Sequence, residues 1–334
     1  TPRARALSYV SCSGNTIGLS PTLQIDSTSK FSWESDSTMR LLNWKEAAIR
    51  LRFCPGCFHS ALFPKFDAAR LYGAAGFEAR KEAYEAHFPG KIYGERERKL
   101  DFAPDLRKMG RDFSRFHQTT SFAAELVQTS FAGMEEIRIL DWGGGDGYVG
   151  SVYSKMLQMI TGLPVGHFVY DYTDWEDADS NKVGLENLRD MGEFHVVLLS
   201  HILEHTHDPV IVVKAALDFL RPGGLLICEV PNETHKIIQA LSRAKFGLNY
   251  HVAHFSSRSL YRTLEQAGLN NIHTTYQYDS SYRGDKMSAI AGVAQKSAVA
   301  LVRGSKPTVL KEVFSLILFT VKKTLAKLLS LDKQ

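Results

Sequence analysis

The amino-acid sequence predicts an α/β fold built on a doubly wound parallel sheet. From about residue 131 to residue 300, short apolar runs alternate with helical patterns, which is typical of parallel strands joined by crossover helices. Within this region the apolar run Ile137–Asp141 leads into a glycine-rich turn, Gly143–Gly147, and then into the helix-forming run Ser151–Ile160. A strand, a glycine turn and a helix in this order bind nucleotide-like ligands at the edge of an open sheet.

The other elements of this region follow in the same alternating order. Arg221–Gly224 is expected to end a helix before the next strand, and Gly268 suits the residue that follows a helix because glycine adopts positive φ without strain. The expected strands are His167–Tyr172, His195–Ser200, Leu225–Val230, Ile272–Tyr278 and Ser288–Ala294, and the expected helices are Pro209–Leu220 and Ser257–Ala267.

Regions of different composition flank the sheet. The first mixes short apolar runs with Ser, Thr and Asp, and strands are expected at Thr22–Ile25 and Ala48–Phe53. The second carries helix formers and charges, as in Glu78–Ala86 and Leu100–Phe113. We therefore expect a small β-rich module over residues 1–65, a helical connector or lid over 66–130, the sheet domain over 131–300 and an amphipathic helix over 301–334.

The C-terminal region predicts a basic amphipathic helix, because lysines such as Lys311 and Lys322 bracket the apolar run Val313–Phe319. Such a helix can pack on its own domain, form a homo-oligomer contact or lie on a membrane surface, and it can also be disordered. We expect a cytoplasmic protein, peripheral at the inner membrane surface if the helix lies on lipid, since no run reaches the roughly 18 to 20 apolar residues of a span.

Composition narrows the class of protein. The 334 residues are 44% hydrophobic and 23% charged, as in an ordinary soluble globule. A net charge of +4, from 40 basic and 36 acidic residues, argues against nucleic acid as the main partner. Four cysteines are too few for a disulfide framework in a chain of this length.

The spacing of the glycines narrows the class of ligand that the turn can bind. Gly143, Gly145 and Gly147 give G-x-G-x-G, one residue shorter than the dinucleotide fingerprint, and Asp141 lies two residues before the first glycine. With Leu203-Glu204-His205 and the Pro222-Gly223-Gly224 block downstream, this turn resembles the motifs of class I S-adenosylmethionine (SAM) methyltransferases. The resemblance covers roughly residues 130 to 295, and implies a Rossmann-like methyltransferase sheet that binds SAM.

The resemblance also implies cofactor contacts. Asp141 and the three glycines would line SAM, and Ser200 and His201, after the next strand of the sheet, would lie near its methionine end. Asp171, at the end of the second strand, can accept hydrogen bonds from the ribose hydroxyls, with Asp174 as the alternative. The short stretch from Asp171 to Phe194 leaves the adenine contact unassigned.

Methyl transfer to most nucleophiles needs a base, and histidines gather in two segments. The segment around His251 and Phe255-Ser256 resembles sugar and polysaccharide methyltransferases, in which a histidine before the Phe-Ser pair is the base, although Leu248 replaces their tyrosine. His251 is the expected base, with His205 and His254 as alternatives, and all three can instead be structural. We expect a sugar, nucleotide-sugar or glycan acceptor methylated at oxygen. The alternatives are a phenol or quinone-type acceptor and a non-catalytic scaffold in glycan assembly.

A cysteine knuckle, Cys54-Pro55-Gly56-Cys57, lies in the β-rich module. Cys12 and His59 would complete a tetrahedral zinc site with this pair, and sugar methyltransferases with an N-terminal zinc module look similar, although they use four cysteines. A degenerate knuckle held by packing is the first alternative. A redox pair is the second, but it requires that a helix follow the knuckle.

Overall fold

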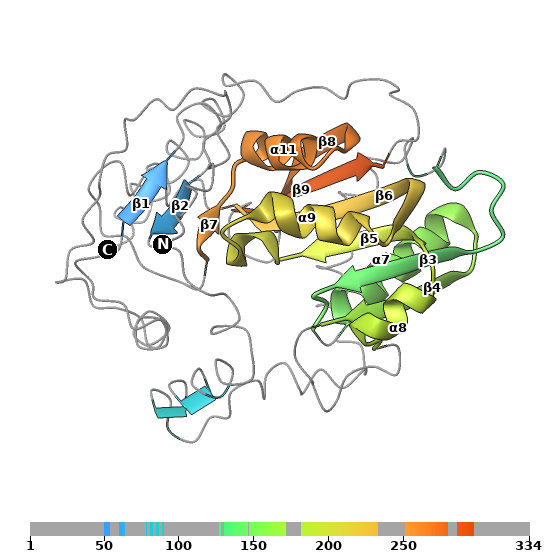
Figure 1. The fold of residues 1–334 in the computed structure, drawn as a ribbon, viewed down its shortest axis with the longest axis horizontal. Coiled ribbons are helices and arrows are strands. Elements are labelled where there is room, and N and C mark those ends of the chain that lie inside the picture. The colour runs from blue at the N-terminus through green and yellow to red at the C-terminus, as the bar shows by residue number, and fades with distance from the viewer. Residues whose placement is uncertain are drawn as a thin grey trace, which may run out of the picture.

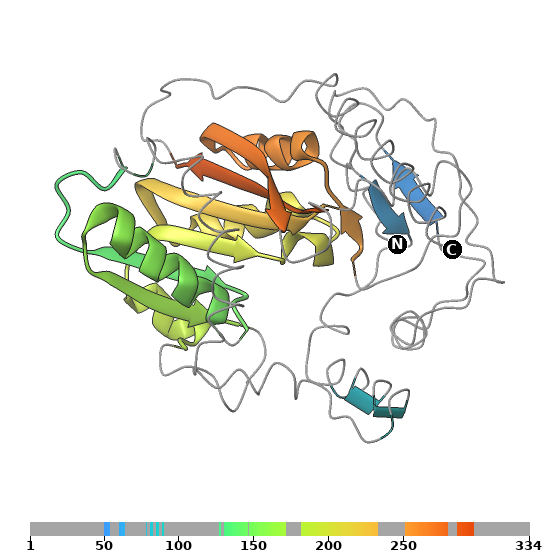
Figure 2. The ribbon, with the colours of Figure 1, turned by 180° about the vertical axis from the view of Figure 1, so that it is seen from behind.

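The computed structural model describes residues 50–53, 60–63, 131–145, 147–171, 182–232, 251–279 and 286–296, with single positions between 78 and 130. Its centre is a six-stranded sheet in the order β4-β3-β5-β6-β9-β8, with helices on both faces (Figures 1 and 2). The strands are β3 Ile137–Trp142, β4 Val165–Tyr170, β5 Phe194–Ser200, β6 Leu220–Pro231, β8 Asn270–Asp279 and β9 Lys286–Gln295. The helices are α7 Tyr148–Thr161, α8 Leu185–Asp190, α9 Pro209–Leu217 and α11 Ser257–Gln266.

The predicted α/β sheet is confirmed, with one correction to its direction. Strands β4, β3, β5 and β6 are parallel, as expected. Strand β9 runs antiparallel to both β6 and β8, so the sheet is not wholly parallel. Strands β8 and β9 follow each other in the chain and pair directly, and two strands that pair in this way without a crossover helix must be antiparallel.

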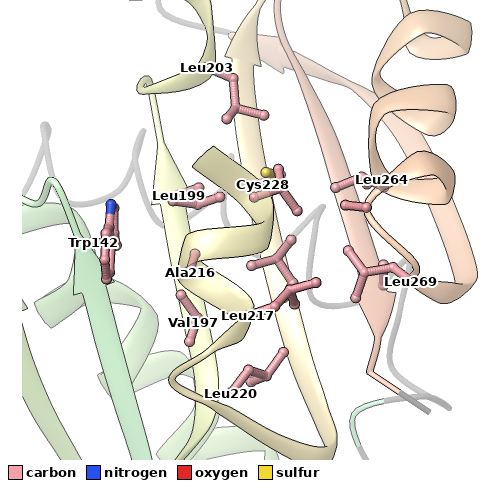
Figure 3. Close-up of a cluster of buried hydrophobic side chains, with 14 of the residues drawn as sticks. Trp142, Val197, Leu199, Leu203, Ala216, Leu217, Leu220, Cys228, Leu264 and Leu269 are labelled. Carbon is pink, nitrogen blue, oxygen red and sulfur yellow. The ribbon is translucent and has the colours of Figure 1, made fainter. Parts of the chain in front are cut away.

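Each face of the sheet has its own hydrophobic core, because alternate side chains of a strand point to opposite faces. On the α7 face, Ile137 and Ile139 of β3 pack with Tyr153 and Leu157. The other face packs against α9 and α11, as Figure 3 shows for Val197, Leu199, Ala216, Leu217 and Leu264. This covering on both sides leaves the ends of the strands as the place for a site.

The Pro-Gly-Gly block lies inside a strand, which corrects the expected boundary. Helix α9 ends at Leu217, and β6 already begins at Leu220. Gly224 accepts a hydrogen bond from the Lys296 backbone N–H (3.0 Å), and the Lys296 ammonium donates to the Leu217 carbonyl (2.8 Å). Contacts with the end of β9 therefore extend the strand back to the helix, which local turn signals do not predict.

An N-terminal hairpin joins the segment that carries His254. Strands β1 Arg50–Phe53 and β2 Ser60–Phe63 are antiparallel, and β2 pairs with β7 Ala253–His254. The expected strand Ala48–Phe53 is confirmed over β1, whereas β2 was not expected. Residues 60–63 form strand β2, so no helix occupies this described segment after the knuckle, where a thioredoxin-type redox pair requires one.

Several expected features lie outside the described residues: the strand Thr22–Ile25, the helix Leu100–Phe113, Asp174 and the C-terminal helix over 301–334. Within Glu78–Ala86, five described positions are helical. In the described part of the chain, no helix is both long enough and apolar enough to cross a membrane.

A partly buried hydrogen bond at the start of β3 predicts a pH effect on stability. The His195 Nδ1 accepts the Arg138 backbone N–H (2.9 Å), and burial, followed by Arg221 and Arg138, lowers the pKa of His195 below 6.5. The contribution of neutral His195 to stability is therefore complete above pH 6.5. It is lost as the pH falls through the lowered pKa of His195 in the folded state. We expect His195→Asn to reduce the fall in thermal midpoint between about pH 7.5 and about pH 5.5. Equal falls in wild type and variant would contradict this assignment.

Candidate functional site

The glycine turn lies where β3 meets α7, and its backbone requires glycine at three positions. Gly143, Gly145 and Gly147 have φ of 73°, 56° and 78°, a region that L-residues with side chains rarely adopt. A Cβ on Gly143 would collide with the Ile202 side chain, whereas a Cβ on Gly145 would meet none of the described residues within 4 Å. The turn therefore packs tightly at Gly143 and faces open space at Gly145.

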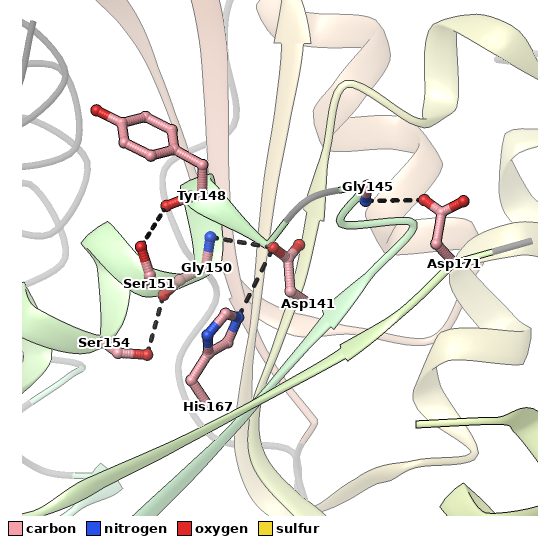
Figure 4. A network of polar contacts seen from close by, with 8 residues as sticks. All are labelled: Asp141, Gly145, Tyr148, Gly150, Ser151, Ser154, His167 and Asp171. Carbon is pink, nitrogen blue, oxygen red and sulfur yellow. Dashed lines mark hydrogen bonds and ion pairs between the residues drawn. The ribbon is translucent and has the colours of Figure 1, made fainter. Parts of the chain in front are cut away.

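Asp141 supports this turn from the interior. Its side chain is 1% exposed, and its Oδ2 accepts the Gly150 backbone N–H (3.0 Å) at the start of α7 (Figure 4). A Cβ on Gly144 would lie 2.5 Å from the Asp141 Cγ, and the His167 Nε2 is 3.9 Å from Oδ2. Asp141, expected to line the cofactor, is instead enclosed behind the turn and fixes the turn to α7.

Asp171 lies directly beside the open part of the turn. It follows β4, and its Oδ2 accepts the Gly145 backbone N–H at 2.8 Å (Figure 4). Its position after β4 agrees with the prediction of a ribose-binding acid, because parallel strands present their carboxyl ends at one edge. The carboxylate and the open space at Gly145 thus form one place for a ligand with hydroxyl groups.

The residues after β5 are held by a buried carboxylate, that of Glu229 on β6. Glu229 is 0% exposed and accepts hydrogen bonds from the Ser200 hydroxyl (3.0 Å) and the Tyr153 hydroxyl (2.9 Å). The His201 backbone N–H donates to the Glu229 carbonyl (3.0 Å), and His201 has φ of 57°. A non-glycine residue in this region is strained, so the surrounding hydrogen bonds hold His201 in an unusual conformation.

Four side chains lie close together at the loop that follows β5, and we call them the histidine cluster: His201, Glu204, His205 and His251. The Glu204 Oε1 lies 3.1 Å from the His201 Nδ1 and 3.8 Å from the His205 Nε2. The rings of His205 and His251 are 5.0 Å apart. Glu204 and His205 belong to a short 3-10 helix, Leu203–His205, after β5, whereas His251 precedes β7.

Backbone contacts hold the cluster together and place it beside the glycine turn. The Val252 backbone N–H donates to the Glu204 carbonyl (2.8 Å), which ties the His251 segment to the 3-10 helix. Ile202, between His201 and the helix, is the residue that a Cβ on Gly143 would meet. The predicted cofactor turn and the predicted base are therefore neighbours.

Glu204 is the member of the cluster to which the sequence assigned no role. Its side chain is 1% exposed, and burial alone would raise its pKa. The hydrogen bond with His201 and the nearby His205, His201 and His251 outweigh burial, so its pKa lies below the usual value. The sequence did contain a signal for a role of Glu204, because this acid directly precedes His205 in a segment with two more histidines.

The other predicted site residues have different outcomes. His254 lies on β7, which pairs with β2. It is only 1% exposed, so it lies in the interior. His205 is 23% exposed, which leaves His205 and His251 as the accessible candidates for the base. Cys12, Cys54, Cys57 and His59 lie outside the described residues, and the zinc prediction stays a prediction.

The open glycine turn, the acid after β4 and the sheet order define a class I SAM-dependent methyltransferase fold. The model of a methyltransferase domain family matches residues 115–274, the part of the chain that holds the glycine turn, Asp171 and the histidine cluster. SAM fits the described residues, because Gly145 faces open space beside the Asp171 carboxylate.

Individual relatives carry a more specific name. The chain is 33% identical over 118 residues to a ubiquinone biosynthesis O-methyltransferase of Ruegeria pomeroyi, covering 33% of this chain and 46% of that protein. A protein of the same name from Ruegeria sp. is 30% identical over 161 residues, covering 42% and 62%. A putative methyltransferase structure from Bacillus halodurans has 15% identity and a TM-score of 0.36, covering 53% and 100%. The chain spans about half the length of the curated relatives it matches.

Proposed function

We propose that this domain transfers a methyl group from SAM to a hydroxyl oxygen of a small phenolic acceptor. The observation that carries the proposal is the contact between two parts of one edge of the sheet. The glycine turn, open at Gly145 and flanked by Asp171, touches Ile202, and Ile202 belongs to the same loop as the histidine cluster. A methyl donor and a group that removes a proton are thereby adjacent, as methyl transfer requires.

The two parts of the proposed site have different roles. The carboxylate of Asp171 accepts the hydrogen bonds of the ribose, and the turn lets the cofactor approach the backbone closely. Bound SAM supplies an electrophilic methyl group. His205 or His251 would take the proton of the acceptor O–H, and the methyl group that SAM supplies would pass from sulfur to that oxygen.

A phenolic acceptor is favoured over a sugar on two grounds. The relatives are named for O-methylation in ubiquinone biosynthesis, so they support the phenol or quinone-type alternative rather than the expected sugar. Chemically, a phenol ionises near pH 10, as tyrosine does, and is easier to deprotonate than an aliphatic alcohol.

An acceptor comparison tests this proposal. The full chain is incubated with SAM and either a dihydroxybenzene carrying a prenyl chain or a nucleotide-sugar, and S-adenosylhomocysteine and the methylated product are measured. We expect methylated phenol and no methylated sugar. Methylation of the sugar alone would restore the first expectation, and SAM binding without turnover on either acceptor would favour the scaffold.

The C-terminal region adds a proposal about location. The basic amphipathic helix expected over residues 301–334 would bring the domain to an anionic lipid surface. Binding of the full chain to anionic vesicles, compared with a chain that lacks this segment, is the corresponding measurement.

A further inference from the structure

We infer that Glu204, His205 and His251 form a binding site for a divalent transition-metal ion of the zinc type, at which the acceptor hydroxyl binds and loses its proton. One ligand atom from each of the three side chains lies within 4.8 Å of the others. Ligand atoms on one ion, each about 2 Å from it, lie at most about 4 Å apart, so closing the set needs movements of about 1 Å. The inference rests on the proposed O-methylation and specifies what removes the proton.

The backbone brings the three ligands together before any ion binds. Glu204 and His205 are consecutive in the 3-10 helix, and the Val252 N–H on the Glu204 carbonyl (2.8 Å) fixes the segment of the third ligand, His251. His201 supports the carboxylate through its Nδ1, 3.1 Å from the Glu204 Oε1. Metal-binding carboxylates are commonly oriented by such an outer hydrogen bond.

The charge of Glu204 supplies an independent reason. The carboxylate is 1% exposed, and its ion-pair partners among the described residues are histidines. Its Oε2 is buried and has no hydrogen-bond partner in the described part of the chain. A buried carboxylate is costly unless it is paired or coordinates a metal, and a divalent cation on Oε2 would supply the missing charge.

The ligand set indicates the kind of ion and its chemistry. Two imidazoles and one carboxylate suit zinc and similar transition metals, whereas magnesium and calcium prefer oxygen ligands alone. Three protein ligands leave a position open, as in catalytic zinc sites. A hydroxyl oxygen bound there has a lowered pKa; its proton leaves to solvent, and the oxygen then takes the methyl group.

Cobalt binding tests the site without SAM or acceptor. The full chain carrying Cys54→Ser and Cys57→Ser, which removes the thiolates of the knuckle, is titrated with Co²⁺ and followed by visible absorption. We expect a cobalt complex without thiolate charge-transfer bands that Zn²⁺ displaces. His251→Ala and His205→Ala should each weaken it by at least about 100-fold, whereas His207→Ala, in the same loop but outside the cluster, should leave it unchanged.

SAM affinity, measured by calorimetry for every variant, reports whether each variant is folded. The inferred site is overturned if folded protein forms no cobalt complex, or if the complex survives in both His205→Ala and His251→Ala. Unchanged kcat in chelator-treated protein would overturn the role of the ion while leaving O-methylation intact. Cobalt binding in a protein that methylates no phenol would support the site and reject the acceptor.

Discussion

Gly145→Val should abolish SAM binding, raising Kd by at least about 100-fold, while the domain stays folded. Gly145 has φ of 56°, and a Cβ there would lie more than 4 Å from the side chains and backbone that the structure describes. The branched side chain of valine would fill the place where the backbone must approach the cofactor. It would also strain the backbone by roughly 1 to 2 kcal/mol, as for any L-residue in the left-handed region. Calorimetric titration with SAM and with S-adenosylhomocysteine measures the effect.

Gly192→Val is the matched control, because it applies the same strain at the other edge of the sheet. Gly192 has φ of 76° and precedes the amino end of β5, and in the described part of the chain nothing lies within 4 Å of its missing Cβ. Both variants should lose similar thermal stability, and only Gly145→Val should lose SAM. If the two variants bind SAM equally well, Gly145 does not line the cofactor.

His251→Ala should lower kcat by about 10² to 10⁴ with SAM affinity unchanged within about two-fold, because we propose that this side chain removes the acceptor proton or holds the ion that does. His251 belongs to the cluster through its ring contact with His205 (5.0 Å), and its neighbour Val252 is bonded to Glu204. Its substitution leaves the glycine turn and Asp171 untouched. Single-turnover rates at saturating SAM separate the chemical step from binding.

His207→Ala provides the comparison for this prediction as well. His207 follows the 3-10 helix by two residues but is not part of the cluster, so kcat should stay within about three-fold of wild type. A His251→Ala enzyme with full activity would remove His251 from the mechanism. Equal losses in the two variants would show that any change in this loop disturbs the site.

The glycine turn and the position of Asp171, the proposed cofactor side of the site, could be predicted because their sequence signals are local. Three glycines with positive φ lie within five residues, and an acid at the end of the next strand reaches the same edge by the geometry of parallel strands. Asp141 shows where local reasoning failed. Its position in the motif was predicted correctly, but its burial behind the turn depends on packing against Gly150 and His167.

The acceptor half could be predicted only in part. His205 and His251 were both candidates, yet their contact brings together segments before and after β6. Glu204 was visible in the sequence, but its significance comes from burial, and burial is a property of the packed chain. His254 illustrates the converse, since pairing of β7 with β2 of the N-terminal hairpin places a plausible base in the interior.

The sequence by itself determined the α/β sheet, the glycine turn and the place of Asp171 after β4, because each follows from backbone preferences over a few consecutive residues. The tertiary structure alone decided the antiparallel direction of β9, the extension of β6 through Gly223 and Gly224, and the histidine cluster. The physical reason is common to all three. Strand direction, burial and the charge around Glu204 depend on contacts between segments far apart in the chain, and no local pattern encodes them.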